Sequence, residues 1–188
     1  NGSHYVTRRD RTAGCPAEST VQGGQCILPE PPANQDIGCD DDNDSQVGNP
    51  CDAATGNKYE SDTDVSIAGI KLTRSYNSQN PQDSGFGKGW SSNVQRRLSV
   101  AGSSILSYRS DGKSEPWVKA GSNWSSDGDE TLMLSEDANG FTLTRANGTN
   151  EYYSLTGQLV SITDTNGLAT QYHYGTNDKV TSIIGPWG

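Results

Sequence analysis

The sequence predicts an all-β fold of consecutive antiparallel β-hairpins, preceded by an irregular arm that disulfides staple. Three observations predict it: short stretches that alternate polar with apolar or β-branched residues, turn signals that contain glycine, and the lack of any helical apolar stripe. Hydrophobic residues make up only 30% of the 188 residues, and glycine occurs 22 times. This composition favours short strands, many turns and a thin core.

Residues 1–47 are predicted to form the arm, because they show no sustained period of 2 or 3.6 and are rich in proline, glycine and aspartate. The chain has four cysteines, at spacings of 11, 13 and 12 residues: Cys15, Cys26, Cys39 and Cys51. These spacings differ from the Cys-x-x-Cys pairs of zinc sites. We expect two disulfides, formed in an oxidising compartment, with three connectivities open. The alternative is four reduced cysteines in a flexible arm.

Residues 48–140 are predicted to form a β domain and residues 141–188 a set of repeated hairpins. The stretches Val65–Ile67, Ile70–Tyr76 and Phe141–Arg145 alternate as half-buried strands do. Four dipeptides signal turns between strands: Asp111-Gly112, Asn139-Gly140, Asn147-Gly148 and Asn166-Gly167. We expect two-residue hairpin turns there, since glycine and asparagine tolerate positive φ.

The last third of the chain repeats itself. Gly157–Ile162 aligns with Asp178–Ile183 at an offset of 21 residues, and the same offset pairs Tyr153 with Tyr174 and Gly167 with Gly188. Each unit is one hairpin, which cannot bury its apolar face alone, so several units must stack. A third copy would begin at Gly188, which predicts that the natural protein continues.

The segment from Gly157 to Tyr174 resembles the Rhs/YD repeat, whose pattern runs Gly-Arg-Leu, then Asp-x-x-Gly, then Tyr-x-Tyr-Asp. It departs from that pattern in detail. Gln158 replaces the arginine, Gly175 replaces the final aspartate, and Asp178-Lys179-Val180 replaces Gly-Arg-Leu. The segment is therefore similar to a degenerate copy.

Three upstream motifs are similar, in the same order, to those of the N-terminal Rhs domain (DUF6531 type) that precedes such repeats. They are Gly48–Lys58, Leu72–Ser78 and the Gly-Phe-Gly-Lys-Gly-Trp turn at Gly85–Trp90. The resemblance covers residues 48–188. In that family the repeats wind into a β-sheet shell, which in bacterial polymorphic toxins and Tc-type toxin complexes encloses a C-terminal toxic domain.

The resemblance implies a non-enzymatic wall segment of a secreted or cell-surface bacterial protein. It places the self-cleavage aspartates of the family beyond this chain. The residues agree, because no catalytic motif is present and only His4 and His173 are neutral-pH bases. Strand alternation predicts that His173 points away from Tyr172 and Tyr174.

Charge limits the partners. Lys and Arg number 14 against 23 Asp and Glu, for a net charge of −9, and no basic run is interleaved with aromatic residues. We therefore expect neither nucleic acid nor an anionic membrane as a partner. No apolar stretch approaches the roughly 18 residues that span a bilayer, so no membrane span is expected.

Two binding sites are possible on residue type. Asp40, Asp42 and Asp44 alternate as in the start of a calcium loop, but Ser45 stands where such a loop has glycine, and a solvated acidic loop is the alternative. Trp117 and Trp124 are candidates for glycan stacking, with burial in the core as the stronger interpretation. No cofactor other than calcium is expected.

Open sheet edges predict the partners. Strands at the ends of a truncated repeat sheet keep unpaired N–H and C=O groups, so we expect β-edge pairing with the rest of a longer chain or with identical subunits. The alternatives to a shell segment are an extracellular filament subunit and a glycan-binding cell-surface adhesin.

Overall fold

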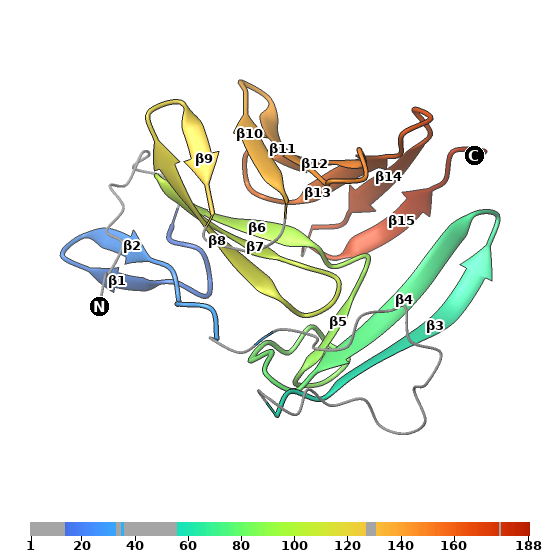
Figure 1. Cartoon of the computed structure of the whole chain (residues 1–188), viewed down its shortest axis with the longest axis horizontal. Coiled ribbons are helices and arrows are strands. Elements are labelled where there is room, and N and C mark those ends of the chain that lie inside the picture. The colour runs from blue at the N-terminus through green and yellow to red at the C-terminus, as the bar shows by residue number, and fades with distance from the viewer. Residues whose placement is uncertain (1–13, 33–34, 36–55, 127–130, 177) are drawn as a thin grey trace. The chain divides into compact units, whose positions relative to one another are not determined.

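A computed structural model describes residues 14–32, 35, 56–126, 131–176 and 178–188. The described residues form fifteen β-strands and no helix, arranged in four sheets of antiparallel hairpins (Figure 1), which confirms the predicted fold class. In every sheet each strand neighbours the strands next to it in the sequence.

Two of the sheets are small. The first consists of β1 (Thr20–Gln22) and β2 (Gln25–Ile27). The second consists, in order, of β3 (Tyr59–Ile67), β4 (Ile70–Asn77) and β5 (Trp90–Ser92).

The other two sheets follow along the chain. The third consists, in order, of β6 (Arg97–Ala101), β7 (Ser104–Tyr108), β8 (Ser114–Ala120) and β9 (Asn123–Ser125). The fourth consists, in order, of β10 (Met133–Glu136), β11 (Gly140–Thr144), β12 (Asn150–Ser154), β13 (Leu159–Thr163), β14 (Ala169–Tyr174) and β15 (Val180–Ile184).

The chain forms two compact units. The first comprises residues 1–31, 97–107 and 115–188, and the second comprises residues 32–96 and 108–114. Each unit is assembled from separated stretches of sequence. The three domains expected from the sequence, residues 1–47, 48–140 and 141–188, stay a prediction.

The first unit has a hydrophobic core. Its buried side chains include Leu98, Ile105, Leu106, Trp117, Trp124, Leu134, Phe141, Leu143, Tyr153, Leu159 and Tyr172. Burial of each large apolar side chain contributes about 1.5–3 kcal/mol relative to exposure. The third and fourth sheets meet in this core, where the rings of Trp124 and Phe141 pack edge to face with centroids 6.2 Å apart.

The second unit has a polar interior instead. Its buried polar residues are Gln35, Asn57, Ser75, Asn77, Asn80, Ser91, Ser92 and Arg109, while Tyr108 is its one buried hydrophobic residue among those the structure describes. Buried polar groups need partners, and the side chain of Asn77 finds two. Its Nδ2 donates to the Gln35 carbonyl at 3.2 Å, and its Oδ1 accepts from the Gln79 N–H at 3.0 Å.

Most of the predicted turns are longer than expected. At Arg109–Lys113, Arg145–Thr149 and Asp164–Leu168 the first N–H donates to the fifth carbonyl, and the fourth N–H donates back to the first carbonyl. Only the glycine at the fourth position takes a positive φ, of 82°, 81° and 78° respectively. These are type I turns followed by a left-handed residue, so the prediction of two-residue turns was wrong there.

The turn dipeptides have a physical role in these loops. Asp111 Oδ1 accepts from the Lys113 N–H at 2.9 Å, and Asn147 Oδ1 accepts from the Thr149 N–H at 3.0 Å. The acidic or amide side chain thus satisfies a backbone donor while its own φ stays negative. At Asn139-Gly140 the side chain of Asp137 does this instead, accepting from both N–H groups.

The 21-residue repeat is present in the fourth sheet. The β12–β13 and β14–β15 pairs each shift register, between Tyr152 and Tyr153 and between His173 and Tyr174. Their turns make the same hydrogen bonds, from Ser154 N–H to Gln158 O at 2.8 Å and from Gly175 N–H to Lys179 O at 2.9 Å. Sequence offset and backbone geometry therefore agree.

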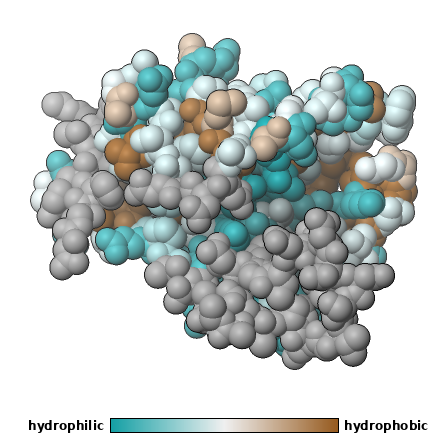
Figure 2. Space-filling view, viewed as in Figure 1, coloured by the Kyte–Doolittle hydropathy of each residue, from teal (hydrophilic) through white to brown (hydrophobic). Residues whose placement is uncertain are grey.

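The surface of the described residues is mostly hydrophilic or neutral, with hydrophobic residues in small scattered groups in the view of Figure 2. Within the described ranges, no helix long and apolar enough to cross a membrane occurs.

Candidate functional site

The described residues of the three motifs that resemble those of the N-terminal Rhs domain lie together in the second unit. We call this cluster the motif junction; it comprises Asn57–Lys58, Arg74–Ser78 and Phe86–Trp90. Ser78 joins the first motif to the second, because its Oγ donates to Asn57 Oδ1 and accepts from the Lys58 N–H, both at 2.9 Å. Asn57 is buried, so this hydrogen bond replaces lost water.

The second and third motifs pair as strands β4 and β5. Tyr76 lies opposite Trp90, and their ring centroids are 5.5 Å apart in a tilted arrangement. The Asn77 N–H donates to the Gly89 carbonyl at 2.9 Å. Gly89 has a φ of 86°, and a Cβ there would come within 2.7 Å of the Tyr76 ring. The glycine is therefore required both by its backbone and by its neighbour.

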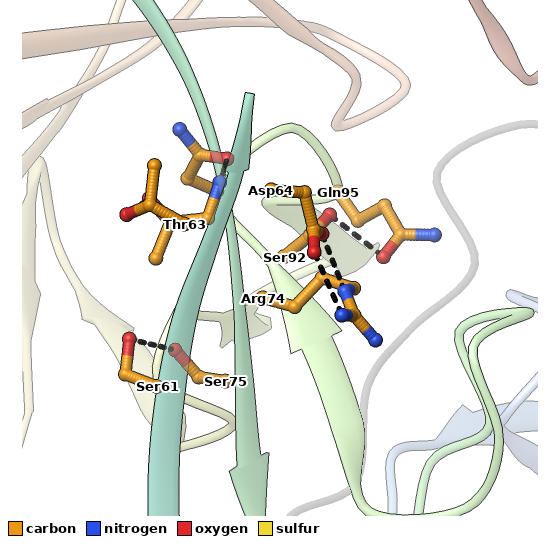
Figure 3. A network of polar contacts seen from close by, with 9 residues as sticks. Ser61, Thr63, Asp64, Arg74, Ser75, Ser92 and Gln95 are labelled. Carbon is orange, nitrogen blue, oxygen red and sulfur yellow. Dashed lines mark hydrogen bonds and ion pairs between the residues drawn. The ribbon is translucent and has the colours of Figure 1, made fainter. Parts of the chain in front are cut away.

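Arg74 lies at the centre of the motif junction. Its guanidinium is 4.9 Å from the centroid of the Trp90 ring and 5.7 Å from that of Phe86. It also makes a bidentate ion pair with Asp64, with Nε–Oδ2 and Nη2–Oδ1 distances of 2.5 and 2.7 Å (Figure 3). Hydrogen bonding within the pair lowers the pKa of Asp64 and raises the pKa of Arg74.

A β-bulge makes this ion pair possible. Thr63 pairs with Thr73 and Val65 pairs with Leu72, so Asp64 is an extra residue in β3. Strand register places Asp62, not Asp64, directly opposite Arg74. The bulge turns Asp64 back toward the guanidinium, as bulges commonly redirect a side chain.

The other face of the same ribbon is lined by hydroxyl groups. The Tyr59 hydroxyl donates to Ser75 Oγ at 3.3 Å, and the hydroxyls of Thr63 and Thr73 lie 3.2 Å apart. Figure 3 shows Ser61 beside Ser75 on this face. These contacts order the sheet, and none of them pairs a nucleophile with a base.

The cysteine and aspartate predictions fall partly outside the described residues. Cys15 and Cys26 form a disulfide, and Cys26 packs against Ala101 of β6. Cys39, Cys51, Asp40, Asp42 and Asp44 lie outside the described residues. Within the part of the chain that the structure covers, no cluster of three or more His, Cys, Asp or Glu side chains could hold a metal ion.

Both tryptophans nominated for glycan stacking are in the core of the first unit. Trp117 is 2% exposed, and its Nε1 donates to Ser107 Oγ at 3.1 Å. Trp124 is 8% exposed, and its Nε1 donates to Glu136 Oε2 at 3.3 Å. The core interpretation therefore describes both rings. His173 is exposed and Tyr172 is buried, as strand alternation predicts.

Sequence reasoning missed a buried carboxylate. Glu151 is 0% exposed, accepts from Arg145 Nε at 2.8 Å and accepts from the Tyr153 hydroxyl at 2.6 Å. The repeat itself could have indicated this burial. At the 21-residue offset Glu151 occupies the position of Tyr172 in the next repeat, and Tyr172 is buried. Near Tyr172, burial raises the pKa of Tyr174 to about 12, and electrostatic interaction with Tyr172 adds to the shift.

A glycine joins the third sheet to the repeat sheet within the first unit. The Leu98 N–H donates to the Gly157 carbonyl at 2.8 Å, and a Cβ on Gly157 would overlap the Leu98 carbonyl. Asp178 takes the equivalent place in the next repeat, with a φ of 57° against 86° at Gly157. Glycine is therefore required at position 157, where β6 packs on the turn.

The fold and the motif junction define a class: an all-β protein whose polar N-terminal domain precedes repeated hairpins. Comparison with protein families gives its membership. The family described as a domain of unknown function (DUF6531) matches residues 48–117, and the RHS Repeat family matches residues 153–186. The chain belongs to the Rhs/YD-repeat family, with a DUF6531 domain followed by repeat.

Curated relatives are similar over about two thirds of the chain. They include the tRNA nuclease WapA of Bacillus subtilis (strain 168) and the tRNA3(Ser)-specific nuclease WapA of Bacillus spizizenii. Each is 28% identical over 134 residues, which is 68% of this chain but 6% of the relative. The chain thus spans a small part of the curated relatives it matches.

Proposed function

We propose that this chain is a non-enzymatic wall segment of a secreted Rhs/YD-repeat protein, whose repeat sheet forms part of a shell around a C-terminal toxin domain. The observation that carries the proposal is the hairpin repeated at 21 residues, with matching register shifts and turn hydrogen bonds. A unit of this kind extends a sheet by two strands per copy.

The edge of β15 supports extension of the sheet. Among the described residues, β15 pairs only with β14, so its outer N–H and C=O groups face away from the sheet. A further repeat would satisfy these groups and continue the wall. The much greater length of the WapA relatives is consistent with such a continuation.

The chemistry of the described residues supports a structural role. Glu151, a fully buried carboxylate, is engaged by Arg145 and Tyr153 within the repeat sheet. His173 lies on an exposed strand face, and its backbone carbonyl accepts a hydrogen bond from the Thr181 hydroxyl at 3.2 Å. The nuclease activity in the names of the WapA proteins belongs to those proteins. We assign any toxic activity of the longer protein to a region outside residues 1–188.

The Cys15–Cys26 disulfide supports an extracellular or cell-surface location, because such bonds form and persist in oxidising compartments. Trp117 and Trp124, the two residues nominated for glycan stacking, are buried and do not favour the glycan-binding alternative.

The experiment uses the full-length natural protein and two glycine variants. Gly157→Ala introduces an overlap with Leu98, whereas Gly167→Ala has a similar positive φ and open space around its Cβ. If the repeats form a closed wall, limited proteolysis should release or degrade the C-terminal domain faster in Gly157→Ala than in Gly167→Ala or the wild type. Equal protease sensitivity in all three proteins would contradict the shell.

The absence of catalysis is tested separately. The purified 188-residue chain, incubated with tRNA under conditions in which a full-length relative cleaves it, should leave the tRNA intact. Cleavage that survives further purification of the folded chain would overturn the non-enzymatic assignment.

A further inference from the structure

Among the residues that the structure describes, no strand lies along the outer edge of β3. β3 stands at the end of its sheet with β4 between it and β5 (Figure 1). Among the described residues it pairs with β4 alone, over eight residue pairs from Tyr59↔Asn77 to Ile67↔Ile70. We propose that this edge binds an extended, basic segment of another polypeptide, added as a further strand.

Both faces of β3 are accessible to a ligand. Every residue from Glu60 to Ile67 is exposed, whereas β4 is half-buried or buried over most of its length. β5 pairs with β4 only at Arg74–Tyr76, so the outer part of the ribbon is two-stranded. A two-stranded ribbon is only marginally stable by itself, and an added strand would stabilise it.

Charge identifies the ligand. Glu60 and Asp62 lie on one face of β3, two residues apart, opposite Tyr76 and Arg74. Arg74 is engaged in the bidentate pair with Asp64, which the bulge brings to it. No ion pair to Glu60 occurs among the described residues. Asp62 also interacts electrostatically with Arg74, which it shares with Asp64. This face of β3 therefore presents two carboxylates, Glu60 and the shared Asp62, at the spacing of alternate residues on a neighbouring strand.

The same carboxylates disfavour a second copy of β3 as the ligand. Paired in parallel, a second β3 would place acidic side chains beside one another, and like charges on adjacent strands are destabilising. Paired antiparallel along its length, it would place its own apolar end, not a basic residue, beside Glu60. Charged residues and bulges are common guards against such self-pairing. A strand with Lys or Arg at alternate positions would be attracted to the carboxylates of β3. The same acidic residues that disfavour self-pairing therefore favour a basic partner.

The far end of β3 defines the other half of the ligand. Val65 is 42% exposed and Ile67 is 69% exposed, beyond the bulge. A ligand running antiparallel to β3 would therefore place β-branched residues in its N-terminal half and basic residues in its C-terminal half. Backbone hydrogen bonds would supply affinity, and alternate side chains would supply selectivity.

The probe is a short synthetic peptide that alternates valine with threonine and then valine with lysine, titrated onto the 188-residue chain. Hydrogen exchange of the β3 amides should slow on binding, while exchange in β15 should not change. Glu60→Lys should weaken binding on the order of tenfold, because an attraction becomes a repulsion. Glu30→Lys makes the same charge change at another exposed carboxylate and should alter binding less than twofold.

Two peptides, N-methylated on alternate residues in opposite phase, separate strand addition from loose electrostatic binding. Only one edge of a ligand strand pairs with β3, so one of the two should lose binding and the other should keep it. Equal binding of both peptides, protection of β15, an equal effect of Glu60→Lys and Glu30→Lys, or no binding would each overturn the proposal. Circular dichroism checks that both variants are folded. The shell proposal is independent of this result, since it rests on the repeats.

Discussion

Gln158 donates a hydrogen bond from its Nε2 to Oδ1 of Asp178, at 2.8 Å. The two residues belong to equivalent turns of neighbouring repeats, and both depart from the Gly-Arg-Leu pattern of the family. Asp178 holds the left-handed position that glycine holds in the preceding turn. The degenerate repeat therefore keeps the turn geometry, with aspartate as the tolerated substitute for glycine.

Asp178→Ala should destabilise the chain by about 1 kcal/mol, because alanine is strained at positive φ and cannot accept the Gln158 hydrogen bond. Asp178→Gly removes the strain as well as the hydrogen bond, so it should stay within about 0.5 kcal/mol of the wild type. Urea unfolding followed by fluorescence measures both. Equal losses for the two variants would show that backbone strain does not govern this position.

Gly157→Ala should be among the most damaging single substitutions, at about 4 kcal/mol or more, because the new Cβ displaces β6 as well as straining the turn. Gly167→Ala has a φ of 78° and open space, so it should lose only about 1–2 kcal/mol from the left-handed backbone. Thermal unfolding of the two variants compares them directly. Similar melting temperatures would mean that β6 does not press on the repeat turn in solution.

Arg74→Lys tests the motif junction. Lysine keeps the charge but loses the bidentate pair with Asp64 and the close approach of the guanidinium to the Trp90 ring, so the variant should be less stable than the wild type. Lys71→Ala, on an exposed side chain of the same strand, should change stability by less than about 0.5 kcal/mol. Equal changes in the free energy of unfolding for the two variants would mean that Arg74 contributes no more to stability than an ordinary surface charge.

Acid titration tests the lowered pKa of Asp64. A carboxylate whose folded pKa lies below the ordinary value of 3.8 adds stability above that value and loses it as the pH falls through the lowered pKa. The Asp64→Asn variant should therefore lose less stability than the wild type when the pH is lowered from 5 toward 2. Unfolding free energies across this range give the comparison, and parallel curves would contradict the assignment.

Peptide mapping under non-reducing conditions should recover a Cys15–Cys26 linkage. If two disulfides form, as the sequence predicts, Cys39 and Cys51 are left to pair with each other. Replacing Cys15 and Cys26 together by serine should lower stability by about 3 kcal/mol in the chain-entropy model, the value for a loop of this size. Four free thiols in the native protein would refute the prediction.

The strands and the repeat could be predicted because local sequence encodes them. Alternation marks half-buried strands such as Ile70–Asn77, and asparagine-glycine pairs mark turns. The turn type was predicted wrongly because the dipeptide alone does not determine whether one or both of its residues adopt a positive φ. That choice follows from hydrogen bonds across the loop, as between Arg145 and Thr149.

The motif junction could be predicted only in part. The three motifs stand in order in the sequence, but nothing local says that Arg74 stacks on Trp90 or that Asp64 reaches back across a bulge. The burial of Ser75 and Asn77 was also missed, since polar residues at alternate strand positions usually face solvent.

The sequence by itself determined the all-β class, the 21-residue hairpin repeat and the order of the family motifs, because backbone preferences and side-chain alternation act over a few neighbouring residues. Tertiary structure alone decided which polar groups are buried and which glycines are indispensable. Asn77 is buried by a contact with Gln35, and Gly157 is constrained by Leu98. Both partners lie far away in the chain, and such non-local packing leaves no periodic signal in the sequence.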